Sequence, residues 1–560
     1  MLKQFSGTRL AVFVILSSLV ALWVVCPSNA AQIDEFIPAD SILYVTIHDL
    51  EAVWETIEAS ENWQAIFDPS IQSQISELNQ AMGLMELLLG TGPLGLVKAF
   101  GHQITFTLFS DDSAEPMIGV VVNTHGTTQE AERIVTGLAQ LAGLAGDNRV
   151  EPYAGTYQEI EYHIVQIDQL TLTYGFVDEF LVVGFTSSSF GALIDTYKKQ
   201  RKSIQSHAEF RQLYEEFAGG RAFAYLNMDA AVSFITANLA DASAEDTVAV
   251  NLVLNDLGLA SFQTLVCGLN LLEGGDGIQL YAQIKPSRRN GILGLLLKEG
   301  QPLQSIQGLS GTEDFFIALS PANSEAIWHT IEMLATTGSA SGEFYDSIAA
   351  IEGFLNLDVE EYIVGALTGE VAAWGNFSES IETFVDPAIV IGLKNRVKWN
   401  AFLDSIQNIE NLSVQHYEYR GTTLYQLPLP PEDPTITAHY GELKNLFLIG
   451  FSNERLESVV NNTLTGREAS PFEEYLKSLP ADPIFLSQLS LDRFLLAVIE
   501  AEGKSSQVLP NAAQRLRGTD MLTSLSVKGN EVWLKIGVPS EATVEVLGKV
   551  AALIVPATIE

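Results

Sequence analysis

Apolar and polar positions along the chain follow two spacings, one typical of strands and one typical of helices. Apolar side chains at i, i+3, i+4 and i+7 predict core-facing helices over Glu130–Leu141 and Val397–Ile406. Short polar turns between period-two segments, such as 177–179, favour antiparallel neighbours. Besides those named below, strands are expected at Ile104–Phe109, Ile118–Val122, Tyr162–Ile167, Leu170–Phe176 and Phe180–Phe185.

A strand, an Asp or Asn, and then a helix occur in this order four times. The four strands are expected at Leu43–Ile47, Ala222–Met228, Phe315–Leu319 and Ile484–Leu491. The residues that follow them are Asp49, Asp229, Asn323 and Asp492. A side-chain oxygen at this point accepts a hydrogen bond from the first amides of a helix, so we interpret these residues as N-caps. A catalytic role for the acids is the alternative.

The two halves of the chain carry the same sequence pattern. The heptapeptide 52–58 recurs at 326–332 with five of seven positions identical. Further matches keep their order: Tyr174-Gly175 with Tyr440-Gly441, Gly184-Phe185-Thr186 with Gly450-Phe451-Ser452, and Phe210 with Phe472. Ordered matches indicate a tandem duplication of a unit of roughly 250 residues, near the size at which single cores stop growing. We therefore expect an α+β fold of two tandem similar halves, each a mostly antiparallel sheet with helices packed on one face.

The chain begins with the pattern of a secretory signal peptide. Lys3 and Arg9 precede the apolar run Leu10–Val25, and Ser28-Asn29-Ala30 has small residues at its first and third positions. The run has 16 residues, fewer than the roughly 20 that span a bilayer, so cleavage after Ala30 is favoured over a retained membrane anchor. The expected divisions are 1–30 for the signal peptide, 31–287 for the first repeat, 288–311 for a linker and 312–560 for the second repeat.

Charge and cysteine content narrow the class of protein. Without Lys3 and Arg9 the chain has 28 basic and 69 acidic side chains, a formal net charge of −41. Such a chain repels phosphate backbones, so nucleic acid is excluded as a partner. One cysteine, Cys267, follows the expected cleavage point, so no internal disulfide can form. We expect an exported, periplasmic or extracellular protein with no integral membrane domain after signal cleavage.

A glycine-rich loop at Gly90-Thr91-Gly92-Pro93-Leu94-Gly95 has the spacing of a dinucleotide-binding loop. It follows a helical pattern at Ile71–Leu89 instead of a strand, so the strand-to-helix turn that holds a pyrophosphate is missing. We assign no cofactor.

The histidines do not form a metal-binding motif. No pair has the spacing that places two imidazoles on one helix face for zinc, and they lie at His48, His102, His125, His163, His207, His329, His416 and His439. His48 and Asp49 could begin a nucleophilic triad, but no Gly-x-Ser-x-Gly segment presents a serine. A pair of carboxylates for glycoside hydrolysis stays open, because 69 acids offer many pairs. We assign no catalytic, cofactor-binding or metal residues.

A family resemblance rests on three features. They are the signal-peptide pattern at the start, Pro38-Ala39-Asp40 followed by a strand and a helix with Trp54, and the strand pair that contains Tyr174-Gly175 and Gly184-Phe185-Thr186. In these features the chain resembles the bacterial domain-of-unknown-function family numbered 3352, over nearly its whole mature length. The resemblance implies a bacterial envelope or secreted protein and transfers no catalytic residues.

Three functional hypotheses follow. The first is a non-enzymatic exported protein that binds an envelope component or serves as a scaffold, because the positions that the two copies share are mainly residues of packing and turning. The second is a carrier of an apolar ligand or lipid held between sheet and helices. The third is a hydrolase that acts on an envelope polymer. Which partner or ligand is bound does not follow from the sequence.

Overall fold

The chain divides into two compact units in the computed structural model. The first comprises Met1–Ala244, Thr264–Leu280 and Ser540–Glu560, and the second comprises Glu245–Gln263 and Tyr281–Pro539. The residues that the structure describes are 33–48, 90–91, 93–110, 115–145, 153–167, 170–217, 222–238, 248, 250–251, 254–255, 258–269, 278–285, 293, 297–320, 324–336, 341–377, 387–408, 414–428, 437–465, 476–490, 493–494 and 520–537. The first copy of the heptapeptide and the expected signal peptide lie outside these residues. The described part of the expected linker, 293 and 297–311, belongs to the second unit.

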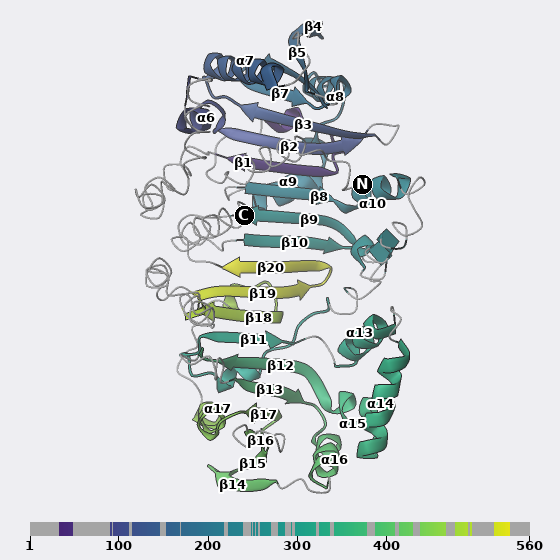
Figure 1. The fold of residues 1–560 in the computed structure, drawn as a ribbon, viewed down its shortest axis with the longest axis vertical. Coiled ribbons are helices and arrows are strands. Elements are labelled where there is room, and N and C mark those ends of the chain that lie inside the picture. Colours follow the sequence, from purple (N-terminus) through teal and green to yellow (C-terminus); the bar gives the residue numbers. More distant parts are fainter. Residues whose placement is uncertain are drawn as a thin grey trace. The chain divides into compact units, whose positions relative to one another are not determined.

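The first unit contains one antiparallel sheet in which neighbours run in the order β4-β5-β6-β7-β3-β2-β1-β8-β9 (Figure 1). Its strands are β1 (Leu43–His48), β2 (Gln103–Ser110), β3 (Pro116–Asn123), β4 (Tyr153–Tyr157), β5 (Ile160–Ile167), β6 (Leu170–Val177), β7 (Phe180–Gly184), β8 (Ala222–Asn227) and β9 (Phe262–Leu269). Its helices are η2 (Ile33–Glu35), α6 (Pro93–Phe100), α7 (Thr128–Ala145), α8 (Ser187–Tyr197), η3 (Ile204–Ser206), α9 (Ala208–Phe217) and α10 (Met228–Asn238). The chain passes between the units within β9 and within β10 (Ile278–Ile284).

The second unit contains an antiparallel sheet in the order β14-β15-β16-β17-β13-β12-β11-β18-β19-β20. Its strands are β11 (Phe315–Leu319), β12 (Leu367–Gly375), β13 (Ala388–Leu393), β14 (Gln415–Tyr419), β15 (Thr422–Pro428), β16 (Thr437–Leu443), β17 (Leu446–Gly450), β18 (Pro483–Ser490), β19 (Asp520–Lys528) and β20 (Glu531–Gly537). Its helices are η6 (Leu259–Ser261), η7 (Ser305–Gly308), α13 (Ser324–Thr336), α14 (Ser341–Leu355), α15 (Val359–Tyr362), η8 (Val364–Ala366), α16 (Arg396–Gln407) and α17 (Asn453–Thr465).

Helices pack on both faces of each sheet, and our expectation of one covered face is wrong. In the first unit α8 lies over Gly119 of β3, where an added Cβ would come within 2.8 Å of a Leu193 methyl carbon. Val120 and Val122, which point to the other face, pack with Phe100 of α6 and Val135 of α7. β3 is apolar on both sides, as expected for a strand that is covered twice. The α+β class and the antiparallel pairing are confirmed.

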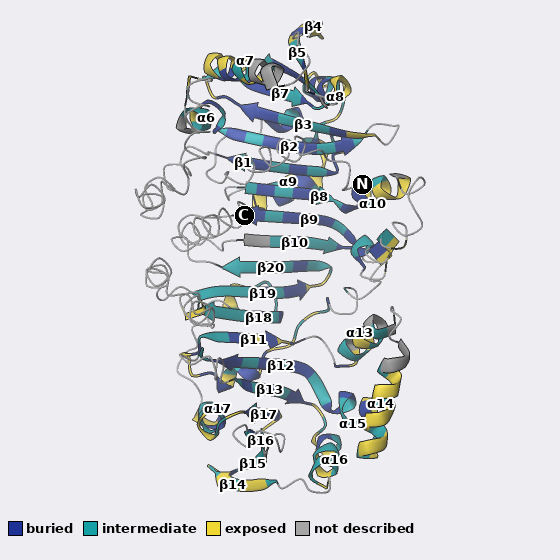
Figure 2. Cartoon of the chain, viewed as in Figure 1, coloured by how far each residue is buried: buried dark blue, intermediate teal, exposed yellow. Residues whose placement is uncertain are grey.

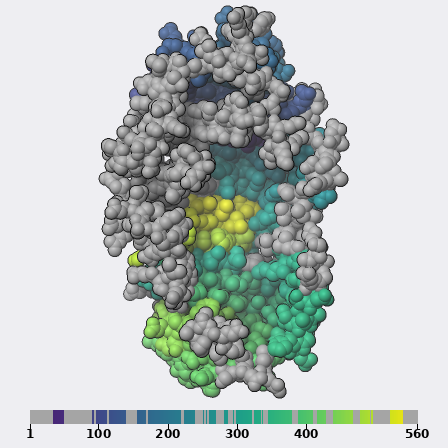
Figure 3. Space-filling model, in the orientation of Figure 1, coloured from purple at the N-terminus to yellow at the C-terminus, as the bar shows by residue number. Residues whose placement is uncertain are grey.

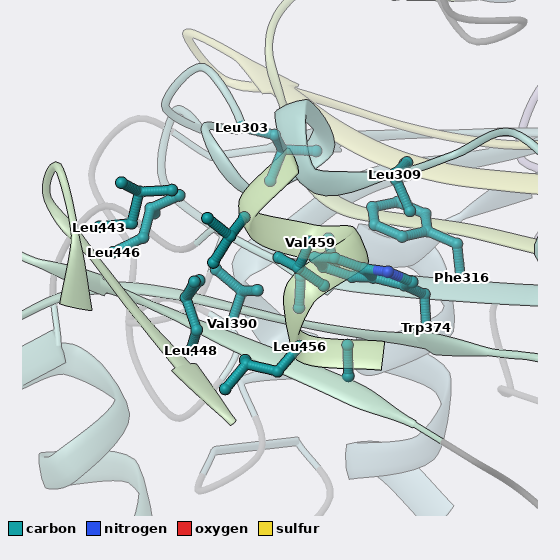
Figure 4. Close-up of a cluster of buried hydrophobic side chains, with 14 of the residues drawn as sticks. Leu303, Leu309, Phe316, Trp374, Val390, Leu443, Leu446, Leu448, Leu456 and Val459 are labelled. Atoms are coloured by element: carbon teal, nitrogen blue, oxygen red, sulfur yellow. The ribbon is translucent and has the colours of Figure 1, made fainter. Parts of the chain in front are cut away.

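The core of the second unit lies between β11–β13 and the helices η7 and α17 (Figure 4). Trp374 and Phe316, each 1% exposed, pack with leucines and valines from β13, β17, α17 and the residues that flank η7. A second cluster on the opposite face joins Trp399 and Phe402 of α16 to Phe447 of β17. Burying an aromatic side chain of this size contributes roughly 2–3 kcal/mol.

Two-residue turns join several strands in both units. Asp178 (φ 52°) lies in the turn between β6 and β7, and Lys444 (φ 55°) lies in the turn between β16 and β17. Gly529 (φ 59°) lies between β19 and β20, and glycine adopts this conformation without strain. The left-handed conformation matches the twist of the strands, so these turns fix the register of each hairpin.

The N-cap predicted at Asp229 is displaced by two residues. The Asn227 side chain accepts a hydrogen bond from the Ala230 amide at 3.1 Å, and Asp229 lies in the first turn of α10. Asn serves as well as Asp at an N-cap, and the strand therefore ends one residue earlier than expected. The other three predicted caps lie outside the described residues.

Candidate functional site

The largest group of buried polar side chains in the described part of the first unit lies at the centre of its sheet. Tyr44, Thr46 and His48 of β1 point to one face, and the antiparallel register places them opposite Thr107, Thr105 and Gln103 of β2. We call these six residues, together with Asp34, Ser41 and Tyr214, the polar layer. All but Tyr214 are buried. Buried polar groups need hydrogen-bond partners, so the site is defined by how they are paired.

Side-chain hydrogen bonds link the two strands directly. The Gln103 amide nitrogen donates to Thr46 Oγ1 at 3.1 Å, and the hydroxyls of Thr46 and Thr105 lie 2.9 Å apart. Thr107 Oγ1 donates to Ser41 Oγ at 2.9 Å, and Ser41 Oγ donates to the Pro38 carbonyl at 2.7 Å. These hydroxyls are bonded to one another and to the backbone, so a structural role accounts for them.

An acid closes one end of the polar layer. Asp34, in η2, accepts a hydrogen bond from the Tyr44 hydroxyl at 2.5 Å. Burial raises the pKa of Asp34 to about 7, although hydrogen bonds from Tyr44 and Gln205 oppose the shift. The pKa of Tyr44 lies well above its usual value because of burial and the nearby charge of Asp34. Near neutral pH the carboxyl group is therefore balanced between its protonated and ionised forms.

A histidine closes the other end. His48 Nε2 lies 3.4 Å from the Tyr214 hydroxyl of α9, and His48 Nδ1 is buried with no hydrogen-bond partner among the residues that the structure describes. Burial, with a smaller contribution from the charge of His102, lowers the pKa of His48 to about 4. The imidazole is thus neutral at physiological pH. His102 in turn stacks on His125, with ring centroids 4.1 Å apart.

Aromatic side chains from α9 cover the polar layer. The Phe210 ring packs edge-on against Tyr44 at 5.1 Å, and Tyr214 packs edge-on against Phe223 of β8 at 5.0 Å. Edge-to-face pairs at this spacing are favourable beyond their buried area. The cover is a reason for the shifted pKa values of Asp34 and His48, because it separates both groups from water.

The arrangement can hold a proton but offers no assembled catalytic group. A general base or nucleophile has to reach a substrate, whereas His48 and Asp34 are each 2% exposed. Asp49, the partner considered for His48, lies outside the described residues. Among the described residues, no group of three or more His, Cys, Asp or Glu side chains could hold a metal ion. Burial also raises the pKa of the Cys267 thiol, so a thiolate is disfavoured there.

Two positions of the second unit that correspond to the polar layer are alanines, and a third is a buried serine. The offset between the two similar heptapeptides places Ala318 at the position of Tyr44 and Ser320 at the position of Thr46. Ala318 faces Ala372 across β11 and β12, as Tyr44 faces Thr107. One carboxylate, Glu370, is buried nearby and accepts a hydrogen bond from the Ser305 amide at 2.7 Å. Burial raises its pKa.

The other histidines are spread over both units. His163 stacks on Tyr174, and His329 lies 3.1 Å from Glu332 on the same helix. His439 is buried, and burial lowers its pKa. Sequence reasoning missed the polar layer, although a signal was present: polar side chains alternate at 44, 46 and 48 and again at 103, 105 and 107.

No protein-family model, curated protein or solved structure matches the chain. Among the described helices, none is both long and apolar enough to cross a bilayer.

Proposed function

We propose that this chain is an exported, non-enzymatic protein that binds an envelope partner or serves as a scaffold. The observation that supports this most is the contrast between the units. The hydroxyls of the polar layer are hydrogen-bonded to one another or to neighbouring groups, and the second unit has alanines where Tyr44 and Thr107 lie. A duplicated catalytic site would keep its polar groups in both copies.

The proposal includes an origin by tandem duplication. Both units have the same order of strands from the edge hairpin to the last shared pair, β8–β9 or β18–β19. Both have a helix after the third strand, α7 or α16, and another after the seventh, α8 or α17. The resemblance to the family numbered 3352 is a further part of the proposal, since that family is bacterial and exported.

Fractionation of the source host, combined with cross-linking in intact cells, tests this function. We expect the mature chain outside the cytoplasm, starting after Ala30, and cross-linked to a specific protein of the envelope. A cytoplasmic chain would contradict the proposal. So would turnover in a panel of hydrolase substrates that the His48→Gln variant abolishes. Native mass spectrometry of the same material would reveal a bound lipid, and a stoichiometric lipid would favour the carrier instead.

A further inference from the structure

Helix α14 of the second unit is apolar in sequence but has no buried side chain among its described positions, 344–355 (Figure 2). Phe354 is 70% exposed, Tyr345 50% and Ile351 44%. By contrast, α17 of the same unit buries Leu456, Val459, Val460 and Thr463. Single exposed apolar residues are ordinary on protein surfaces, but a helix that exposes several of them within three turns is typical of an interaction site.

One side of α14 packs within the unit and another does not. Phe344 contacts Trp328 of α13, with ring centroids 6.1 Å apart. Ser347, Ala350, Ile351 and Phe354, spaced i, i+3, i+4 and i+7, are all exposed, and residues with this spacing share one face of a helix. Figure 3 shows the surface of this helical layer, coloured green, at the lower right of the molecule. α14 therefore presents a narrow apolar stripe.

Acidic residues are frequent in α14 and in its sequence neighbours α13 and α15. From Ser324 to Tyr362 the sequence contains no Lys or Arg and eight acids: Glu325, Glu332, Glu343, Asp346, Glu352, Asp358, Glu360 and Glu361. The first basic side chains after this segment belong to the start of α16 and its preceding turn, and each lies in an ion pair. The pairs are Lys394 with Glu325, Arg396 with Glu442 and Lys398 with Glu361. The charge left for a partner is negative.

We propose that the exposed face of α14 docks a cationic, amphipathic segment of another protein. Apolar side chains of the partner would cover Ile351 and Phe354, and its Lys or Arg side chains would meet the surrounding acids. A second copy of this chain would bring acid against acid, and an anionic bilayer would repel the same surface. The inference rests on the proposed binding function and names the chemistry of its partner.

The full-length mature chain is titrated against a fluorescent synthetic helix of alternating leucine and lysine clusters, with anisotropy as the readout. We expect Phe354→Ala to weaken binding about tenfold, as for the loss of a central apolar contact. The matched control is Leu138→Ala, because Leu138 is also an exposed apolar residue on a helix, α7 of the first unit; its binding should equal that of the parent. Circular dichroism should show that both variants keep the parent's melting temperature.

The charge requirement is tested separately. Asp346→Asn combined with Glu360→Gln should weaken binding several-fold and reduce its dependence on salt. Equal binding of a helix with glutamate in place of lysine would overturn the proposal, as would parent-like binding by Phe354→Ala. A dimer, or binding to zwitterionic vesicles, that Phe354→Ala abolishes would also overturn it, in favour of self-association or a membrane. A partner cross-linked in cells to another surface would overturn this inference and leave the proposed function standing.

Discussion

The centres of the two sheets pair their strands in the same way but fill the space above them differently. In the first unit Tyr44 faces Thr107, within a layer of hydroxyl, amide, carboxyl and imidazole groups. In the second unit Ala318 faces Ala372, next to the apolar cluster of Trp374 and Phe316. The same strand order therefore forms over a bonded polar layer or over an apolar core. The backbone pairing and the turns specify the architecture, and the polar layer belongs to the first unit.

A hydrogen bond between the edge hairpin and a helix occurs in both units, with different donor and acceptor side chains. At the end of β4 the Tyr157 hydroxyl donates to Asp195 of α8 at 2.9 Å. At the end of β14 the Asn461 amide of α17 donates to the Tyr419 hydroxyl at 2.7 Å. Tyr157 and Tyr419 each end the edge strand of their unit, and Asp195 and Asn461 lie in helices that follow the seventh strand of their unit. The contact joins the edge hairpin to the helix in each case, which indicates a structural requirement that two different side chains can meet.

The largest effect is expected from truncating a buried aromatic side chain that occupies the same place on the second strand of each unit. Trp374→Ala should lower the free energy of unfolding of the second unit by about 3–5 kcal/mol, because it leaves a cavity among packed neighbours. Phe109→Ala, two residues beyond Thr107 as Trp374 is beyond Ala372, should cost the first unit a similar amount. Denaturant titration with hydrogen exchange in β2 and β12 measures each unit. A loss under about 1 kcal/mol at either site would break the correspondence.

The next effect concerns pH and separates the units. Asp34 has a raised pKa, so the stability it contributes is complete below about 3.8 and is lost as pH rises through about 7. His48 has a lowered pKa, so its contribution is present above about 6.5 and is lost as pH falls through about 4. The two slopes, each roughly 1.4 kcal/mol per pH unit at most, oppose one another between pH 4 and 6.5.

The first unit of the parent protein should therefore have nearly constant stability between pH 4 and 6.5. Asp34→Asn should leave a stability that rises with pH in this window, and His48→Gln should leave one that falls. Thermal unfolding followed at β1 and β8 measures both slopes. If the single variants kept the flat profile of the parent, the assigned ionisation of the polar layer would be wrong.

A smaller effect is expected inside the polar layer. Thr46→Val should cost about 1–3 kcal/mol, because the Gln103 amide and the Thr105 hydroxyl lose a buried partner. Adding Thr105→Val to Thr46→Val should lower the free energy of unfolding by less than Thr105→Val does alone, because the Thr105 hydroxyl has already lost its partner. Additive losses in this double-mutant cycle would show that the two hydroxyls do not interact.

The smallest effect should come from the edge hairpins. Tyr419→Phe removes a half-buried hydrogen bond and should cost about 0.5–1 kcal/mol. Tyr157→Phe removes an exposed one and should cost less. Hydrogen exchange of β14–β15 and β4–β5 detects the local loosening, with β19–β20 as an internal reference. A larger loss at Tyr157 than at Tyr419 would reverse the expected order.

Local patterns in the sequence predicted many of the described strands. β11 has the expected bounds, and β8 and β18 differ from theirs by one residue. These segments carry their own signals, because strand period, turn residues and caps act between neighbours in the chain. The side of the sheet that helices cover was not predicted, since it depends on segments such as α8 and α17 that return from far along the chain.

The polar layer was not predicted because β1 buries its polar side chains and leaves its apolar side chains half-buried, the reverse of the usual pattern. In Leu43–His48 the apolar positions 43, 45 and 47 are only half-buried, whereas the polar positions 44, 46 and 48 are fully buried. A strand that alternates apolar and polar side chains normally turns its polar side to water. Here α9 covers the polar side, and the polar side chains of β2 lie next to it. Residues 43–48 by themselves do not indicate either neighbour.

The position of β1 also has a consequence for how the protein forms. β1 pairs with β2 on one side and with β8 on the other, so Leu43 lies opposite both Leu108 and Leu226. In the second unit, β11 likewise pairs with β18, which comes much later in the chain. A chain that emerges from the ribosome amino-terminus first exposes the edge of each central strand until much later residues arrive. Such long-range closure is slow and favours wrong pairing, so we expect chaperone dependence during synthesis.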